Sequence, residues 1–260
     1  MAVTVTTGKT ASRYSRVLFG GVNLSGDART IGSVGVTYAE VDVTGWSGTV
    51  MEYLLDTPVA SFGPFQAVMN NNATAVGPVE AGSHTTLSAV GQPIATFVQG
   101  IREAPTIGAP AFSLLSNQKS YTATAQQGGT ILIDADFGGY IGMTYTPKFG
   151  VALGVGTTVS DTTNFGSVDN GGSSANGAIA VLHVTQSVGA MAANSWAIKL
   201  QDSANDSDWA DLITFTADGS AVAAEYDDTT ITSTVDQYTR LQVTKSAGTD
   251  IVCWAVLIRL

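Results

Sequence analysis

Residues Thr130–Asp136 read TILIDAD, and this stretch decides the fold. In an extended chain, one face of the stretch would carry the apolar side chains Ile131, Ile133 and Ala135. The opposite face would carry Leu132, Asp134 and Asp136. Such alternation has the period of a β-strand, because successive Cβ atoms point to opposite sides of a sheet. The stretch therefore predicts a strand with an apolar face and an acidic face.

Similar alternation recurs along the chain, while sustained helical periodicity is nearly absent. The segments expected to be strands are Ile94–Glu103, Thr130–Asp136, Ala178–Thr185, Trp196–Gln201, Leu212–Thr216, Tyr238–Thr244 and Ile251–Arg259. Valine, isoleucine, threonine and aromatic residues dominate them, which is typical of a half-buried pleated surface. Asparagine–glycine pairs such as Asn176–Gly177 favour tight turns between them. The sequence predicts an all-β chain.

One segment is open to two interpretations. Ser61 could cap a short helix in which Phe65, Val68 and Met69 share one face. The same residues could instead form a strand that ends in the polar loop Asn70–Asn72.

The length of 260 residues favours two units of about 120–140 residues each. The glycine-rich stretch Gly138–Gly142 is the best boundary, and it divides the chain into residues 1–138 and 139–260. Closely spaced strands in the second unit predict a C-terminal β-sandwich.

Charged residues make up only 12% of the chain and hydrophobic residues 44%. Lipid, other protein chains or a monomer surface rich in Ser, Thr, Asn and Gly could each account for this composition. The longest apolar runs, Ile179–Val184 and Ile251–Ile258, are far shorter than the roughly 20 residues of a spanning helix. Met1–Thr7 also lacks the pattern of a signal peptide. We expect no membrane insertion and favour burial against other chains, with the monomer as the alternative.

Net charge is −10, with only 11 lysines and arginines. Stable binding of a phosphate backbone relies on clustered basic residues, so a nucleic-acid-binding role is not expected.

No pattern of catalytic, cofactor-binding or metal-ligating residues stands out. His183 lies within an expected strand and His84 in an expected loop, and neither has the context of a nucleophilic site. The single cysteine, Cys253, lies in an apolar run and is expected to be buried. The oxygen-rich segment Asp202–Asp211 lacks the glycine and glutamate of an EF-hand, so we interpret it as a solvated turn. We therefore expect no catalytic residues, no cofactor and no metal.

Two acidic pairs carry the main functional hypothesis. In Tyr38–Val43, Glu40 and Asp42 share one face, and Asp134 and Asp136 do so in their own stretch. A strand with one acidic and one apolar face suits a barrel wall that is exposed to water on one side. These four carboxylates are candidates for an acidic channel lining that repels DNA; an ordinary solvent-facing surface is the alternative.

Several longer stretches resemble a known family. Gly21–Tyr53, GVNLSGDARTIGSVGVTYAEVDVTGWSGTVMEY, resembles the opening of siphovirus major tail proteins, and GIREAPTIGAPAF and QKSYTATA within Pro93–Phe137 also resemble that family. GAIAVLHVT, WAIKLQDSANDSDWADLITFT, TVDQYTRLQV and AVLIRL in the last third are similar to the C-terminal region of long-tailed phage virion proteins.

The resemblance implies a tail-tube-type β domain in residues 1–138 and a structural, non-enzymatic role in the virion. Subunits of this family form stacked rings around a channel through which DNA passes during ejection. Trimeric rings, or alternatively hexameric ones, are implied, with tape measure, tail terminator and baseplate proteins as partners and assembly in the host cytoplasm. A head decoration or minor virion protein remains an alternative. A carbohydrate- or receptor-binding module is another, with Trp196, Trp209 and Trp254 as a sugar platform, although alternation favours core positions for Trp196 and Trp254.

Overall fold

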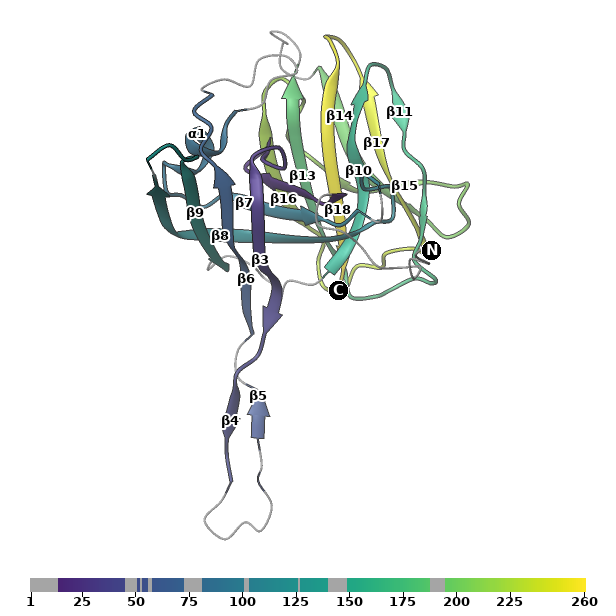
Figure 1. The fold of residues 1–260 in the computed structure, drawn as a ribbon. Helices are drawn as coiled ribbons and strands as arrows, with labels where there is room; N and C mark the ends of the chain where they lie inside the picture. The colour runs from purple at the N-terminus through teal and green to yellow at the C-terminus, as the bar shows by residue number, and fades with distance from the viewer. Residues whose placement is uncertain are drawn as a thin grey trace, which may run out of the picture.

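The computed structural model describes residues 14–44, 51, 53–55, 58–72, 81–100, 103–125, 127–139, 149–187 and 195–260. Nearly all regular structure in these residues is β-strand, which confirms the all-β prediction (Figure 1). The described strands are β1 (Arg16–Phe19), β2 (Val22–Asn23), β3 (Ala28–Thr37), β4 (Glu40–Asp42), β5 (Tyr53–Leu55), β6 (Val59–Val68), β7 (Ile94–Val98), β8 (Pro110–Thr124), β9 (Leu132–Gly139), β10 (Phe149–Val159), β11 (Thr163–Asn164), β12 (Val168–Asp169), β13 (Ala178–Ser187), β14 (Trp196–Ser203), β15 (Ala210–Thr214), β16 (Ala223–Asp228), β17 (Tyr238–Lys245) and β18 (Ile251–Arg259). The helix α1 (Ser83–Leu87) is five residues long. None of the described helical residues forms a helix long and apolar enough to cross a membrane.

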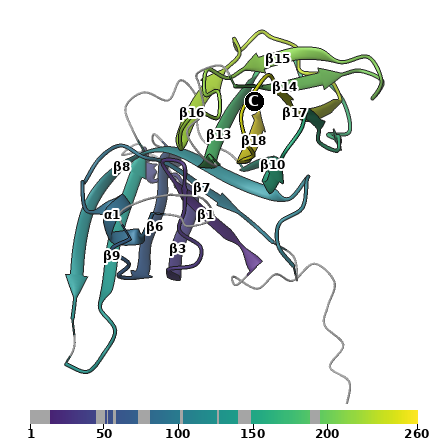
Figure 2. The ribbon, with the colours of Figure 1, turned by 90° about the horizontal axis from the view of Figure 1, so that it is seen from above.

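The largest sheet contains eleven antiparallel strands, and its main path runs β16-β13-β18-β10-β8-β7-β1-β2. The 15-residue strand β8 belongs to two parts of this sheet. Its first half pairs with β7 and β10, and its second half pairs with β9, which continues through β6 to β3. The sheet folds over on itself at β8, so that the strands of the first unit enclose a core of their own (Figure 2).

That core is built around a cluster of phenylalanines. Phe19 of β1 contacts Phe62 and Phe65 of β6 and Phe137 of β9, with ring centroids 5.3, 5.2 and 4.7 Å apart. All four rings are fully buried. Since aromatic side chains bury large apolar areas, these contacts hold β1 against the opposite wall of the folded sheet.

The second unit is a β-sandwich. A five-stranded sheet ordered β11-β17-β14-β15, with β12 also paired to β17, lies over β10, β13 and β18 of the large sheet (Figure 2). Trp196 and Leu241 from the small sheet and Leu182 and Leu153 from the large one meet in the core between them.

The two halves share a sheet and a core. β8 of the first half pairs with β10 of the second, and a cluster that includes Leu18, Val98, Ile179 and Val256 lies across the junction. The domain boundary at residue 138 stays a prediction; it falls at the end of β9.

Three sequence predictions are refined by the structure. The ambiguous segment after Ser61 is part of strand β6, because it lies between β3 and β9 and pairs with both. Ile94–Glu103 is a shorter strand, since β7 ends at Val98. The prediction of a loop at His84 is wrong: this residue lies in α1, whose Leu87 is buried against the first core.

Candidate functional site

An exposed two-stranded arm extends from the body of the molecule (Figure 1). It continues the β3–β6 ribbon into a separate small sheet, in which β4 pairs with β5. We define the arm as the described residues 38–44, 51 and 53–55. A lone hairpin is at best marginally stable in water, because it has no core to bury. The arm is therefore the part of the described fold that most needs a partner.

The arm exposes large apolar side chains on both of its faces. Val41 is directly opposite Leu54, and these side chains are 45% and 61% exposed. Tyr53 and Met51 are 50% and 71% exposed, and the Tyr53 hydroxyl lies 3.1 Å from Met51 Sδ. Contiguous exposed apolar surface of this kind typically marks an interaction site.

The first acidic pair, Glu40 and Asp42, lies on the arm. Both residues are exposed, and they share a face with Tyr53, because Asp42 is the cross-strand partner of Tyr53. Hydrogen bonds from the side chain and the backbone N–H of Thr44 hold the pKa of Asp42 below its ordinary value. Asp42 is thus a carboxylate at neutral pH, and one face of the arm is both acidic and aromatic.

The second acidic pair, Asp134 and Asp136, lies on β9 with the predicted alternation. Both side chains are partly exposed, while Ile133, Ala135 and Phe137 on the other face are buried. Asp134 accepts a hydrogen bond of 2.9 Å from Gln66 Nε2, and Asp136 lies 4.0 Å from Lys119 Nζ. The outward face of β9 is therefore polar and acidic.

The two acidic pairs do not form one cluster. β6 pairs with β9 at Asp134 and with β3 at Thr37, and β3 leads into β4 of the arm, so the β3–β6 ribbon connects the two acidic pairs. Gln66, which faces Asp134, and Val59, which faces Thr37, are seven positions apart on β6, or roughly 23 Å. Glu40 lies farther out still. The structure places one pair on the body and the other on the arm.

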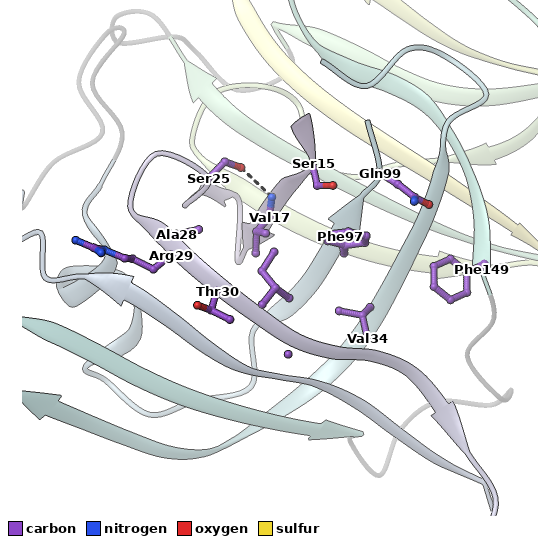
Figure 3. Close-up of a pocket in the computed structure, with 12 residues that line it drawn as sticks. Ser15, Val17, Ser25, Ala28, Arg29, Thr30, Val34, Phe97, Gln99 and Phe149 are labelled. Carbon is purple, nitrogen blue, oxygen red and sulfur yellow. Dashed lines mark hydrogen bonds between the residues drawn. The ribbon is translucent and has the colours of Figure 1, made fainter. Parts of the chain in front are cut away.

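A groove of about 570 Å³ lies along the inner side of β3, where the folded sheet is open between β3 and β1 (Figure 3). Its lining is Ser15, Val17, Ser25, Ala28, Arg29, Thr30, Ile31, Gly32, Val34, Phe97, Gln99 and Phe149, and we call it the seam groove. Phe149 is 54% exposed. At Gly32, the backbones of β3 and β6 in the groove wall lie close together. A Cβ added to Gly32 would lie 2.7 Å from the carbonyl oxygen of Gly63.

The histidines have structural partners. His183 is fully buried; Nδ1 accepts a hydrogen bond of 3.2 Å from the Gly21 N–H, and Nε2 lies 2.8 Å from Thr96 Oγ1. Burial lowers the pKa of His183 to about 3. His84 Nδ1 lies 2.6 Å from the Tyr121 hydroxyl. Cys253 is buried, which raises the pKa of its thiol to about 12 and disfavours the reactive thiolate.

Only residues 204–209 of the polar segment Asp202–Asp211 form the predicted turn, because β14 ends at Ser203 and β15 begins at Ala210, and Asp202 is buried. Asn205 Oδ1 accepts hydrogen bonds of 3.0 and 2.9 Å from the N–H groups of Ser207 and Asp208, which leaves that oxygen engaged by the backbone. Across the described ranges, no three His, Cys, Asp or Glu side chains gather in a way that could hold a metal ion.

The three tryptophans proposed as a sugar platform, all in the described part of the chain, do not form an exposed platform. Trp196 and Trp254 are 2% and 5% exposed, as alternation predicts. The guanidinium of Arg240 lies over the ring of Trp209, 4.0 Å from its centroid, and covers that face.

Sequence reasoning gave Tyr38–Val43 an apolar face but missed the exposed Met51, Tyr53 and Leu54 of the arm and the whole seam groove. The arm had a signal, because the apolar residues of VDVT and MEYLL flank a segment that contains Gly45 and Gly48. The groove had none, since its lining comes from four strands and the loops beside them. A scan against protein-family models and a search of curated proteins each found no match to this sequence.

Proposed function

We propose that this chain is a structural, non-enzymatic subunit that assembles with copies of itself as the major tail-tube protein of a long-tailed phage. The observation that carries the proposal is the arm, which exposes the side chains of Val41, Met51, Tyr53 and Leu54. Such a hairpin gains stability only when another surface covers it. A subunit that meets copies of itself in every ring and every layer supplies that surface.

The outward face of β8, β9 and β6 supports a role as a channel wall. It is lined by Ser120, Thr122, Asp134, Asp136 and Gln66, with Lys119 as a neighbouring cation. An electronegative wall with few cations gives DNA little counterion-release attraction, so DNA slides past it without being held.

In this proposal the subunits form rings that stack into a tube in the virion tail, after assembly in the host cytoplasm. Trimeric rings require both halves of the chain to contribute to the wall, whereas hexameric rings require only the first half. Tape measure, terminator and baseplate proteins would bind the tube inside and at its ends.

Negative-stain electron microscopy and sedimentation of the purified chain at increasing concentration test the proposal. Rings or hollow tubes are the expected result, and the double variant Met51→Ser/Tyr53→Ser should assemble poorly while its thermal unfolding is unchanged. Ile231→Ser is the matched control, because Ile231 is 57% exposed but lies on the second half. A wild-type chain that stays monomeric at high concentration, with or without a tail initiation complex, would refute the proposal.

A further inference from the structure

The seam groove and the arm are complementary surfaces that the single chain leaves uncovered. We propose that the seam groove binds the arm of a second copy of this chain, with Glu40 of the arm against Arg29 and Met51 against Phe149. This inference rests on the self-association proposed above and names the site at which it occurs.

A chain cannot place its own arm in its own groove. Arg29 and Val34 of the groove lie on β3, and the arm begins where the same strand ends, past Thr37. β3 is paired with β6 up to Thr37, so the ribbon is held straight as it leaves the body (Figure 1). To fill its own groove the arm would have to fold back by about half a turn at Tyr38–Ala39, which would leave Glu40 near Thr37, eight residues along β3 from Arg29. The occupant must come from another molecule.

The two surfaces have similar lengths. Arg29 lies at one end of the groove and Phe149 at the other (Figure 3), and Arg29–Val34 spans five residues of β3, or about 16 Å. On the arm, the acidic face runs from Glu40 to the Asp42–Tyr53 pair, and Met51 Sδ lies 3.1 Å from the Tyr53 hydroxyl. Met51 is four positions along the sequence from Leu55, the partner of Glu40, which corresponds to at most about 13 Å of extended chain. This face fits the groove lengthwise.

The chemistry of the two surfaces matches position by position. The middle of the groove is apolar, with Val17, Ile31 and Phe97, and the middle of the arm face presents the ring of Tyr53 with the Asp42 carboxylate beside it. Tyrosine and methionine are enriched at protein interfaces, because they bury large areas. Arg29 is exposed, and no carboxylate in the described part of the chain lies within ion-pair distance of it. Glu40 of an incoming arm would supply one.

The contact is heterologous, because arm and groove are different surfaces. Each copy can offer its arm to one neighbour and its groove to another, which builds a ring or an open series of subunits rather than a closed dimer. Stacked layers need this kind of directional contact.

Cysteine cross-linking tests the geometry in the full chain. The double variant Met51→Cys/Phe149→Cys should give a ladder of disulfide-linked chains on non-reducing gels, while buried Cys253 stays outside the reaction. Leu54→Cys/Phe149→Cys is the matched control. Leu54 is the partner of Val41 on the opposite face of the arm, so its sulfur would point away from the groove and form no ladder.

A charge exchange tests the ion pair. Arg29→Glu and Glu40→Arg should each raise the concentration needed for assembly roughly tenfold, with unchanged thermal unfolding, since attraction becomes repulsion. An equimolar mixture of the two variants should assemble again: the intact arm of one fits the intact groove of the other, and the exchanged pair is also complementary.

Three outcomes separate this inference from the proposed function. Tubes that form without the Met51–Phe149 ladder, and that tolerate Arg29→Glu, overturn the inference and leave the tail-tube proposal standing. A ladder without rings or tubes supports the inference and counts against the tube. A chain that never self-associates overturns both.

Discussion

Acid should destabilise this protein through one buried histidine. His183 on β13 links the two halves of the chain, because its ring contacts Gly21 beside β1 and Thr96 on β7. Since Nδ1 accepts the hydrogen bond from Gly21, we assign the ring proton to Nε2, which donates to Thr96 Oγ1; Thr96 in turn lies 2.9 Å from Ser113 Oγ. A second ring proton would have no acceptor here, and the added charge would be fully desolvated.

The magnitude follows from the pKa difference between the folded and unfolded chain. Burial lowers the folded pKa of His183 to about 3, from an ordinary value of 6.5. Above pH 6.5 the residue is neutral in both states and contributes no pH dependence. Below pH 6.5 only the unfolded chain takes up the proton, so the free energy of unfolding falls by about 1.4 kcal/mol per pH unit until the folded pKa is reached. At pH 4.5 this amounts to about 2.7 kcal/mol.

Urea unfolding followed by tryptophan fluorescence at pH 7.0 and pH 4.5 measures this loss. His183→Gln should be less stable than wild type at pH 7.0 by about 1–3 kcal/mol, because it leaves buried groups unpaired. Between pH 7.0 and pH 4.5, the free energy of unfolding of the variant should fall by about 2.7 kcal/mol less than that of wild type. The carboxylates contribute equally to the pH dependence of the two proteins, so their contribution cancels in this comparison. Equal acid losses in wild type and His183→Gln, or a His183 ring that titrates near pH 6 by NMR, would refute the reasoning.

Two further predictions concern the backbone and the acidic wall. Gly156→Ala should lower the free energy of unfolding by about 2–4 kcal/mol in denaturant titrations, because Gly156 has φ +69° and an added Cβ would meet the ring of Trp254. Gly171→Ala, at φ +77° with open space around it, should cost only about 1–2 kcal/mol; equal losses in the two would contradict the steric argument. Asp134→Asn/Asp136→Asn should leave tube assembly unchanged but slow DNA ejection from phage that carry it, and an unchanged ejection rate would argue against a channel-facing β9.

Strand positions were predictable wherever alternation and β-branched residues coincided. Ile251–Arg259 matches β18 residue for residue, and Ala178–Thr185 forms all but the last two residues of β13. Strand β16, with the sequence AAEYDD, escaped prediction because its residues have little strand propensity. It exists because it pairs along β13 at the edge of the large sheet, which is a long-range contact.

The sequence predicted which acidic side chains share a face of a strand, but not how the strands of the candidate site are arranged. Alternation placed Asp134 and Asp136 on a wet face and Glu40 beside Asp42 correctly, because this depends only on the local period of two. It carried no information on which strands become neighbours. The sequence therefore gives no hint that one acidic pair belongs to an arm, or that His183 meets Gly21 from 162 residues away.

Exposed apolar side chains are distributed unevenly between the two halves of the chain. Among the described residues, the exposed large hydrophobic side chains are Tyr38, Val41, Val43, Met51, Tyr53, Leu54, Val59, Val90, Ile131, Phe149 and Ile231. The first seven lie on the arm or at its base, and Phe149 lies in the seam groove, whereas Ile231 is the only other one beyond residue 139. The described surface of the second half therefore exposes few large apolar side chains outside the seam groove. The need for a partner is concentrated at the arm and the groove, so a few substitutions there should abolish assembly without unfolding the subunit.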